Sequence, residues 1–146
     1  MWHLRRTKAK AMQRSDGVIL YSASDIVNFL NCEHLTALDL VNLDTPLPKA
    51  EDDEEAILYQ TKGLAHEKAY LDRLKQHARG FADISAEEDM AVAVPRTIEA
   101  MRGGAEIIYQ AALADGPFVG HADFLRRVPA PSALGGYSYE VIDTKL

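Results

Sequence analysis

The stretch that decides the fold spans residues 106–128 and reads EIIYQAALADGPFVGHADFLRRV. Two runs rich in apolar and aromatic residues flank Asp115-Gly116-Pro117, and this combination of residues is typical of a tight turn between strands. We therefore predict an antiparallel hairpin with strands at 106–114 and 118–128.

A third extended segment follows the hairpin. Residues 129–136 are rich in Pro, Gly and Ser and predict a loop, which leads into residues 137–146, YSYEVIDTKL. Because side chains alternate along a strand, period two places four residues of this segment on one face: Tyr139, Val141, Asp143 and Lys145.

Upstream of the hairpin the pattern is mainly helical. Residues 18–21 form a short strand-like run, and Ser22 to Asp25 resembles a capping box at a helix start. Apolar residues at helical spacing predict one helix up to Asn31 and a second one that ends near the two prolines of residues 45–48.

The strongest helical signal covers residues 54–79, with Gly80 placed to end the helix. The acidic run of residues 51–55 favours the start of this helix, because carboxylates stabilise a helix N-terminus. Residues 81–84 carry a weak strand signal. Pro95 is predicted to be the first residue of a helix that runs to Arg102.

These elements predict an α+β fold in which N-terminal helices precede a three-stranded mixed or antiparallel sheet. We expect three segments: a flexible basic arm at 1–14, a helical lead-in at 15–50, and a sheet-containing part at 51–146. The arm holds five basic residues and no acidic one.

Composition narrows the class of protein. The chain has 146 residues, 47% of them hydrophobic and 26% charged, as expected for a globular domain. A net charge of -6 means that any nucleic acid must bind through local basic patches or a bound cation. Cys32 is the single cysteine, and no apolar run approaches the roughly 20 residues that span a bilayer, so we expect a cytoplasmic protein without a membrane contact.

Two carboxylates on neighbouring strands suggest a metal site. If the second and third strands pair, Asp123 and Asp143 meet across the ladder at roughly 5 Å. Such a pair repels unless a proton or cation bridges it, and oxygen ligands suit Mg²⁺ or Mn²⁺. Lys145 lies two residues after Asp143, where an ammonium group can orient water or balance phosphate charge, and the Thr144 carbonyl is a plausible further ligand.

The Asp-x-Lys pattern alone is weak, because charges alternate in many exposed strands. The separation of 20 residues between Asp123 and Asp143 matches a strand, a loop and a returning strand. On the long helix, Gly63 lies about one turn before His66, so a bare backbone lies beside an imidazole.

Taken together, three segments resemble the leading motifs of the RecB-like nucleases, a branch of the PD-(D/E)XK superfamily: GLAHEKAYLDRL at 63–74, GHADFL at 120–125 and YEVIDTKL at 139–146. Residues 21–40, YSASDIVNFLNCEHLTALDL, are similar to the helical lead-in of bacterial putative nucleases of that family. The resemblance runs from about Met12 to the end of the chain.

The resemblance implies a restriction-endonuclease-like core and a hydrolase of DNA phosphodiester bonds. It assigns metal contact to His66, makes Asp123 the second-motif aspartate, and makes Asp143 and Lys145 the signature pair. The family core runs α-β-β-β-α-β, so the helix with the family's glutamine and tyrosine is expected beyond Leu146; the chain is then an N-terminal fragment, inactive in isolation. Relatives carry RNase H-like or helicase domains, which implies DNA repair or recombination.

Other residues have open interpretations. Tyr109 and Gln110 line the cleft or simply pack, and His121 shares a face with Asp123 but is expected to be a plain strand residue. Glu67 projects about 100° away from His66 around the helix, so we expect no direct role for it. Cys32 resembles the first of four cysteines that hold an iron–sulfur cluster in some relatives; the other three are absent, so we expect a buried structural cysteine and no cluster in this chain.

Two hypotheses compete with a nuclease. The first is a non-catalytic nucleic-acid-binding or scaffold module that keeps the nuclease fold. The second is an α+β domain in which Asp143 and Lys145 are surface charges that point into solvent away from Asp123.

Overall fold

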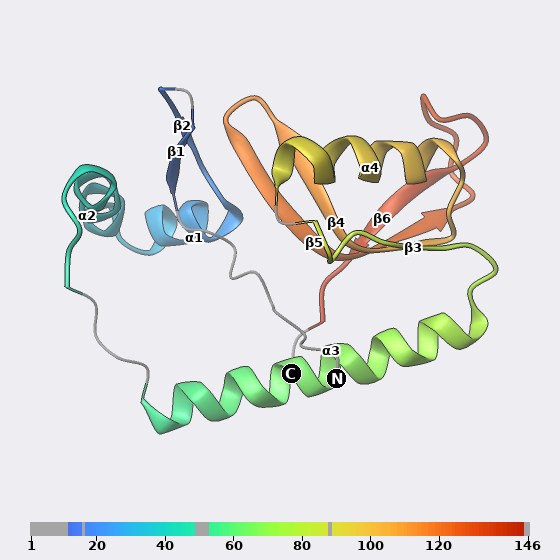
Figure 1. Ribbon diagram of the computed structural model, residues 1–146, viewed down its shortest axis with the longest axis horizontal. Coiled ribbons are helices and arrows are strands. Elements are labelled where there is room, and N and C mark those ends of the chain that lie inside the picture. Colours follow the sequence, from blue (N-terminus) through green and yellow to red (C-terminus); the bar gives the residue numbers. More distant parts are fainter. Residues whose placement is uncertain (1–11, 16, 49–52, 88, 145–146) are drawn as a thin grey trace. The chain divides into compact units, whose positions relative to one another are not determined.

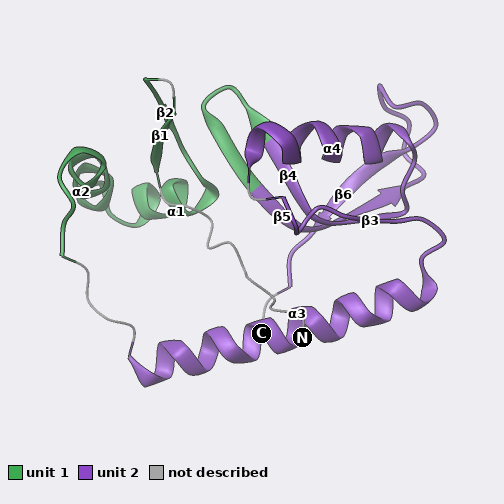
Figure 2. Ribbon diagram, viewed as in Figure 1, with its two compact units in different colours: residues 1–49, 114–120 green, residues 50–113, 121–146 purple. Residues whose placement is uncertain are grey.

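The computed structural model describes residues 12–15, 17–48, 53–87 and 89–144. The chain forms two compact units (Figure 2), and each is described by itself. Unit 1 comprises residues 1–49 together with 114–120, and unit 2 comprises residues 50–113 and 121–146.

Unit 1 begins with a small antiparallel ribbon. Strand β1 (Gln13–Ser15) pairs with β2 (Val18–Leu20), and Gly17 takes a positive φ of 79° at the turn. The predicted basic arm is therefore wrong at its C-terminal end: Met12 is buried and Arg14 lies in a paired strand. Residues 1–11 of that arm lie outside the described residues.

Two helices follow the ribbon. Helix α1 (Ala23–Asn31) starts at the predicted capping box, in which Ser22 and Asp25 exchange hydrogen bonds, and α2 (Glu33–Asp44) follows after Cys32. The carboxylate of Asp25 is buried and accepts from the backbone N–H of Met12 (3.1 Å) and from the N–H and hydroxyl of Ser22 (2.6 and 2.8 Å). One acidic side chain thus joins the chain before β1 to the start of α1.

The tip of the later hairpin belongs to the same unit. Tyr21 donates its N–H to the carbonyl of Pro117 (2.8 Å), and Val119 donates its N–H to the carbonyl of Tyr21 (2.9 Å). The rings of Tyr21 and Phe118 lie 6.0 Å apart. Sequence periodicity did not reveal this pairing, because it joins residues almost 100 positions apart.

Unit 2 is built on a four-stranded mixed sheet in the order β3-β4-β5-β6. The strands are β3 (Phe81–Asp83), β4 (Ile107–Asp115), β5 (Phe118–Val128) and β6 (Ser138–Ile142). Strand β3 is parallel to β4, and β6 is antiparallel to β5. The expected three-stranded sheet is therefore wrong, because the short β3 run, too short for a periodic signal of its own, adds a fourth strand beside β4.

Two helices cover the two faces of this sheet (Figure 1). Helix α3 (Glu54–His77) contributes Leu71 to a cluster with Ile107, Tyr109 and Phe124. Helix α4 (Met90–Arg102) contributes Ala93 to a separate cluster. Its core partners come from the residue after β3 and from β4 and β5: Ile84, Ile108, Ala111, Ala112, Ala122 and Leu125. Neighbouring residues 107 and 108 serve opposite faces, as the alternation of a strand requires.

Helix α4 begins earlier than predicted. Asp89 caps its N-terminus by accepting from the N–H of Ala91 (2.8 Å), so Pro95 lies inside the helix and not at its first position. Thr97 is fully buried, donates its hydroxyl to the carbonyl of Ala93 (3.0 Å) and accepts the N–H of Ala112 (3.0 Å), which ties α4 to β4. None of the helices in the described part of the chain combines the length and apolar content needed to cross a membrane.

Candidate functional site

The centre of the candidate site is Glu67, a carboxylate on the sheet-facing side of α3. Its side chain is 4% exposed, although it lies on the same helix face as Leu71 and Leu74 of the apolar cluster. The hydroxyl of Tyr109 donates to its Oε1 at 3.0 Å, and Nε2 of Gln110 donates to the same oxygen at 2.7 Å. A buried charge needs such donors, because leaving it unpaired in the interior costs several kcal/mol.

His66 does not share this position. One residue along a helix turns the side chain by about 100°, and His66 is exposed while Glu67 is buried. Glu67 is thus buried beside Tyr109 and Gln110 of β4, a position that the sequence analysis did not predict. Its place in the apolar stripe with Leu71 and Leu74 was the signal that identifies it. Metal contact by His66 stays a prediction.

Tyr109 and Gln110 reach the same carboxylate although they are neighbours on β4. Gln110 has a φ of 52°, the left-handed region, which interrupts the alternation of side chains in the strand. Two consecutive side chains can therefore contact Glu67. A residue other than glycine holds this conformation at a cost of about 1–3 kcal/mol, and such strain gathers at functional sites.

The phenol of Tyr109 lies in a negative environment. Burial raises the pKa of Tyr109 well above its ordinary value, and the carboxylates of Glu67, Asp83 and Asp123 raise it further. Tyr109 therefore remains a protonated donor at neutral pH. Its hydroxyl donates to the Glu67 carboxylate of α3.

Asp123 and Asp143 lie at the junction of β5 and β6. The antiparallel register pairs Phe124 with Ile142, so Asp123 and Asp143 each lie one residue beyond that pair. Strand β6 ends at Ile142, which corrects the predicted strand up to residue 146, and Asp143 is exposed just after it. Lys145 lies outside the described residues.

Thr144 contacts Asp123 in an unexpected way. Both its backbone N–H and its hydroxyl donate to Oδ2 of Asp123 at 3.0 Å. These two donors orient a half-buried carboxylate, and the Thr144 carbonyl as a further metal ligand stays a prediction. The chain after β6 is thereby fastened to β5 at the aspartate.

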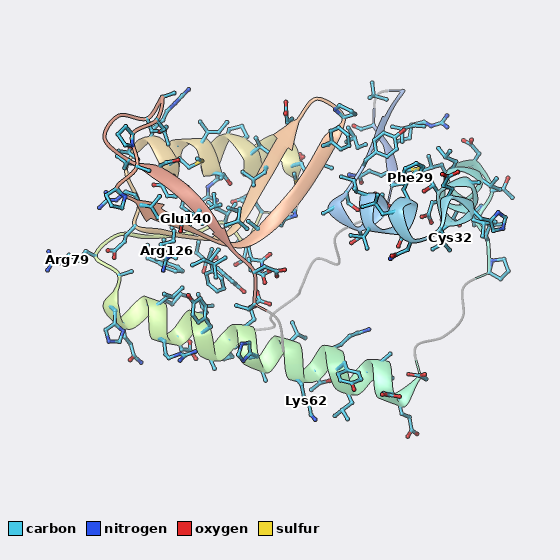
Figure 3. All side chains as sticks on the ribbon, turned by 180° about the vertical axis from the view of Figure 1, so that it is seen from behind. Phe29, Cys32, Lys62, Arg79, Arg126 and Glu140 are labelled. Carbon is cyan, nitrogen blue, oxygen red and sulfur yellow. The ribbon has the colours of Figure 1, made fainter. Side chains whose placement is uncertain are left out.

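The remaining predicted residues lie at the periphery. His121 is exposed, and partial burial lowers its pKa, which favours a neutral imidazole. A Cβ added at Gly63 would meet nothing within 4 Å, so no described neighbour requires glycine there. In unit 1, Cys32 is exposed, so the expectation of a buried structural cysteine is wrong (Figure 3).

The candidate metal ligands at the β5–β6 junction are carboxylate oxygens, and hard oxygen ligands suit Mg²⁺ or Mn²⁺. In the part of the chain that the structure describes, no group of three or more His, Cys, Asp or Glu side chains is arranged to hold a metal ion. Mg²⁺ in proteins commonly takes only one or two carboxylates and keeps several waters. The pair at the β5–β6 junction, Asp123 and Asp143, fits that requirement in number and in chemistry.

Comparison of the chain with family models, with curated proteins and with solved structures gives no match in any of the three.

Proposed function

We propose that this chain carries the site of a metal-dependent nuclease that hydrolyses phosphodiester bonds of DNA, as the motif resemblance implies. The observation that carries the proposal is the β5–β6 register, which places Asp123 and Asp143 each one residue beyond the Phe124–Ile142 pair, with Asp123 oriented by two hydrogen bonds from Thr144. Two carboxylates on neighbouring strands repel each other unless a proton or a cation lies between them, which favours a bound divalent ion at this place.

In this proposal Asp123 and Asp143 hold a divalent cation. Thr144 fixes the rotamer of Asp123 through its two hydrogen bonds, which leaves the second oxygen, Oδ1, for the ion. A bound Mg²⁺ or Mn²⁺ would supply neutralisation of phosphate charge at this place. Lys145 is assigned its role from its position two residues after Asp143, where an ammonium group orients water or balances charge on the phosphate.

Glu67 extends this acidic site on the helix side. Tyr109 and Gln110 both donate to Oε1, so Oε2 has neither of these hydrogen bonds. A carboxylate held in this way can accept a proton or a hydrogen bond from water without rearranging. We propose that Glu67 orients a water molecule and that Tyr109 and Gln110 are its positioning residues.

Cleavage of linear DNA, with Mn²⁺ or Mg²⁺ present, by a longer protein that contains all 146 residues tests the proposal. We expect Asp123→Asn and Asp143→Asn each to lower the rate at least about 100-fold, because each removes a charge that holds the cation. Asp115→Asn is the matched control: it makes the same change at an exposed residue at the end of β4 and should leave the rate unchanged.

Calorimetric titration with Mn²⁺ separates the nuclease from the alternative of a non-catalytic module. A nuclease site binds the ion with an affinity that Asp123→Asn weakens. Equal cleavage rates for the wild type and for Asp143→Asn or Lys145→Ala would remove these residues from the mechanism. Metal binding that is indifferent to Asp123 would favour the scaffold hypothesis instead.

A further inference from the structure

One flank of helix α3 carries a stripe of basic and aromatic side chains. Its members follow each other at spacings of three or four residues, which places them within about 80° around the helix: Tyr59, Lys62, His66, Tyr70, Arg73 and His77. We call this set the α3 stripe. The stripe is centred about 100° around the helix from Glu67 and extends over roughly 27 Å at 1.5 Å per residue.

The side chains of the α3 stripe are exposed, and the acidic residues along this part of the helix are either buried or paired with a lysine outside the stripe. All members of the stripe are exposed except Tyr70, which is partly buried, and Lys62 projects from the helix away from the sheet (Figure 3). Within residues 59–77 the acidic residues are Glu67, which is buried against the sheet, and Asp72, which pairs with Lys68 at 2.7 Å. Lys75 on the other flank pairs with Asp83 at 3.5 Å.

By contrast, neither Lys62 nor Arg73 forms an ion pair with another residue in the described ranges. The guanidinium of Arg73 lies over the ring of Tyr70, 5.5 Å from its centroid. His77 donates its Nδ1–H to the carbonyl of Arg73 (2.8 Å), which holds the imidazole beside that arginine. These cations are therefore available to an external anion, in a chain whose net charge is -6.

We infer that the α3 stripe binds the phosphate backbone of a single-stranded nucleic acid, with Tyr59 stacking on a base. Single-strand sites combine a basic track with aromatic platforms, and the stripe alternates both along one helix flank. Tyr59 is 60% exposed, so its ring face can receive a base. The choice of nucleic acid over another polyanion rests on the proposed function.

The stripe also reaches the candidate site. Tyr70, its partly buried member, packs edge-on against Phe124 with ring centroids 5.1 Å apart. Phe124 is the neighbour of Asp123 on β5 and pairs with Ile142 of β6. A nucleic acid bound along the α3 stripe is therefore adjacent to β5 and to the end of β6, which carry the proposed metal ligands.

Fluorescence anisotropy with labelled oligothymidylate of about 16 nucleotides tests this binding surface. The titration uses the whole chain in EDTA, so that cleavage and metal binding do not contribute. For Lys62→Gln/Arg73→Gln we expect about tenfold weaker binding and a slope of log affinity against log salt that is shallower by about 1.4, because each phosphate contact on a single strand contributes roughly 0.7.

The matched control is Lys68→Gln/Lys75→Gln, which makes the same charge change on the opposite flank of the same helix and should retain the wild-type slope. Tyr59→Ala should weaken binding roughly fivefold or more, and Tyr59→Phe should restore it, because stacking needs the ring and not the hydroxyl. Circular dichroism confirms that each variant is folded.

Equal slopes for the two double variants would overturn the inference, since bulk charge alone would then explain binding. Competition by polyglutamate as strong as by oligothymidylate would also overturn it, in favour of an acidic protein partner. Asp143→Asn should bind the oligonucleotide like the wild type, so loss of cleavage with intact binding tests only the metal site. Loss of binding in the Lys62→Gln/Arg73→Gln variant tests only the α3 stripe.

Discussion

The two units of the molecule are stabilised in different ways. The buried described residues of unit 1 are Met12, Ser22 and Asp25, two of them polar and joined by hydrogen bonds. Unit 2 instead has an apolar cluster on each face of its sheet. In unit 1 the apolar side chains of both helices remain largely exposed, among them Phe29 at 49% and Leu30 at 76% (Figure 3).

The difference teaches that a helix can be specified without a core of its own. Helix α1 has a reciprocal capping box and α3 is capped by Asp53, so both starts are determined locally. Only α3 then buries its apolar residues against a sheet within its unit. We therefore expect the loss of a buried polar side chain to destabilise unit 1. In unit 2 we expect the loss of a buried apolar side chain, which leaves a cavity, to be destabilising.

The largest effect should come from Phe124→Ala. Phe124 is fully buried and contacts the rings of Tyr70 and Tyr109, so the cavity left by the substitution should lower the free energy of unfolding of unit 2 by about 3–5 kcal/mol. Hydrogen exchange should show lost protection in β4, β5 and β6, with α1 and α2 unchanged. Equal loss of protection in α1 and α2 would contradict this expectation and would show that the two units unfold together.

A smaller effect, confined to unit 1, is expected for Asp25→Ala. The substitution leaves the buried N–H of Met12 and of Ser22 without their acceptor, which should cost about 2–3 kcal/mol. Hydrogen exchange of residues 18–31 measures it. Asp44→Ala is the control, because its ion pair with Arg14 is exposed and contributes less than about 1 kcal/mol. Wild-type exchange in the Asp25 variant would show that unit 1 does not depend on its polar cluster.

The smallest effect is expected for Tyr109→Phe, which removes one hydrogen-bond donor to Glu67. At neutral pH the free energy of unfolding should fall by about 1.5–3 kcal/mol, or by less where neighbouring groups rearrange around the carboxylate. Because folding raises the pKa of Tyr109, the wild type retains this contribution below pH of about 10, the ordinary tyrosine pKa, and loses it as the pH rises further.

Denaturant unfolding at pH 8 and at pH 10.5 checks both statements. The Tyr109→Phe variant should be less stable than the wild type at pH 8, and the difference should narrow at pH 10.5. Tyr59→Phe, at an exposed tyrosine, should follow the wild type at both values. A constant difference would mean that Tyr109 ionises equally in the folded and unfolded states.

Much of the fold was predictable because its signals are local. The capping box at Ser22, the helix that starts after Asp53 and the turn at Gly116 each follow from residues a few positions apart, and the structure confirms all three. The start of α4 was missed because Pro95 is typical of the first position of a helix, whereas the helix begins at Met90 after the Asp89 cap. The parallel pairing of β3 was missed because a three-residue strand carries no period.

The candidate site was predictable only in part. The sequence suggested an antiparallel pairing of the second and third extended segments, and β5 and β6 do pair in this way, with Asp143 directly after β6. It missed the burial of Glu67, because which flank of α3 meets the sheet depends on packing with Phe124 and Tyr109. It also missed the positive φ of Gln110, which interrupts the alternation of side chains in β4, since the surroundings impose this conformation on a residue other than glycine.

The sequence by itself determined the positions of most helices and strands, because caps, turns and periodicity act between near neighbours in the chain. Only the tertiary structure decided that Glu67 and not His66 meets the sheet, that Thr144 donates to Asp123, and that the hairpin tip pairs with Tyr21. Each of these contacts joins residues far apart in the sequence, and their partners are chosen by burial and hydrogen-bond satisfaction in the folded molecule.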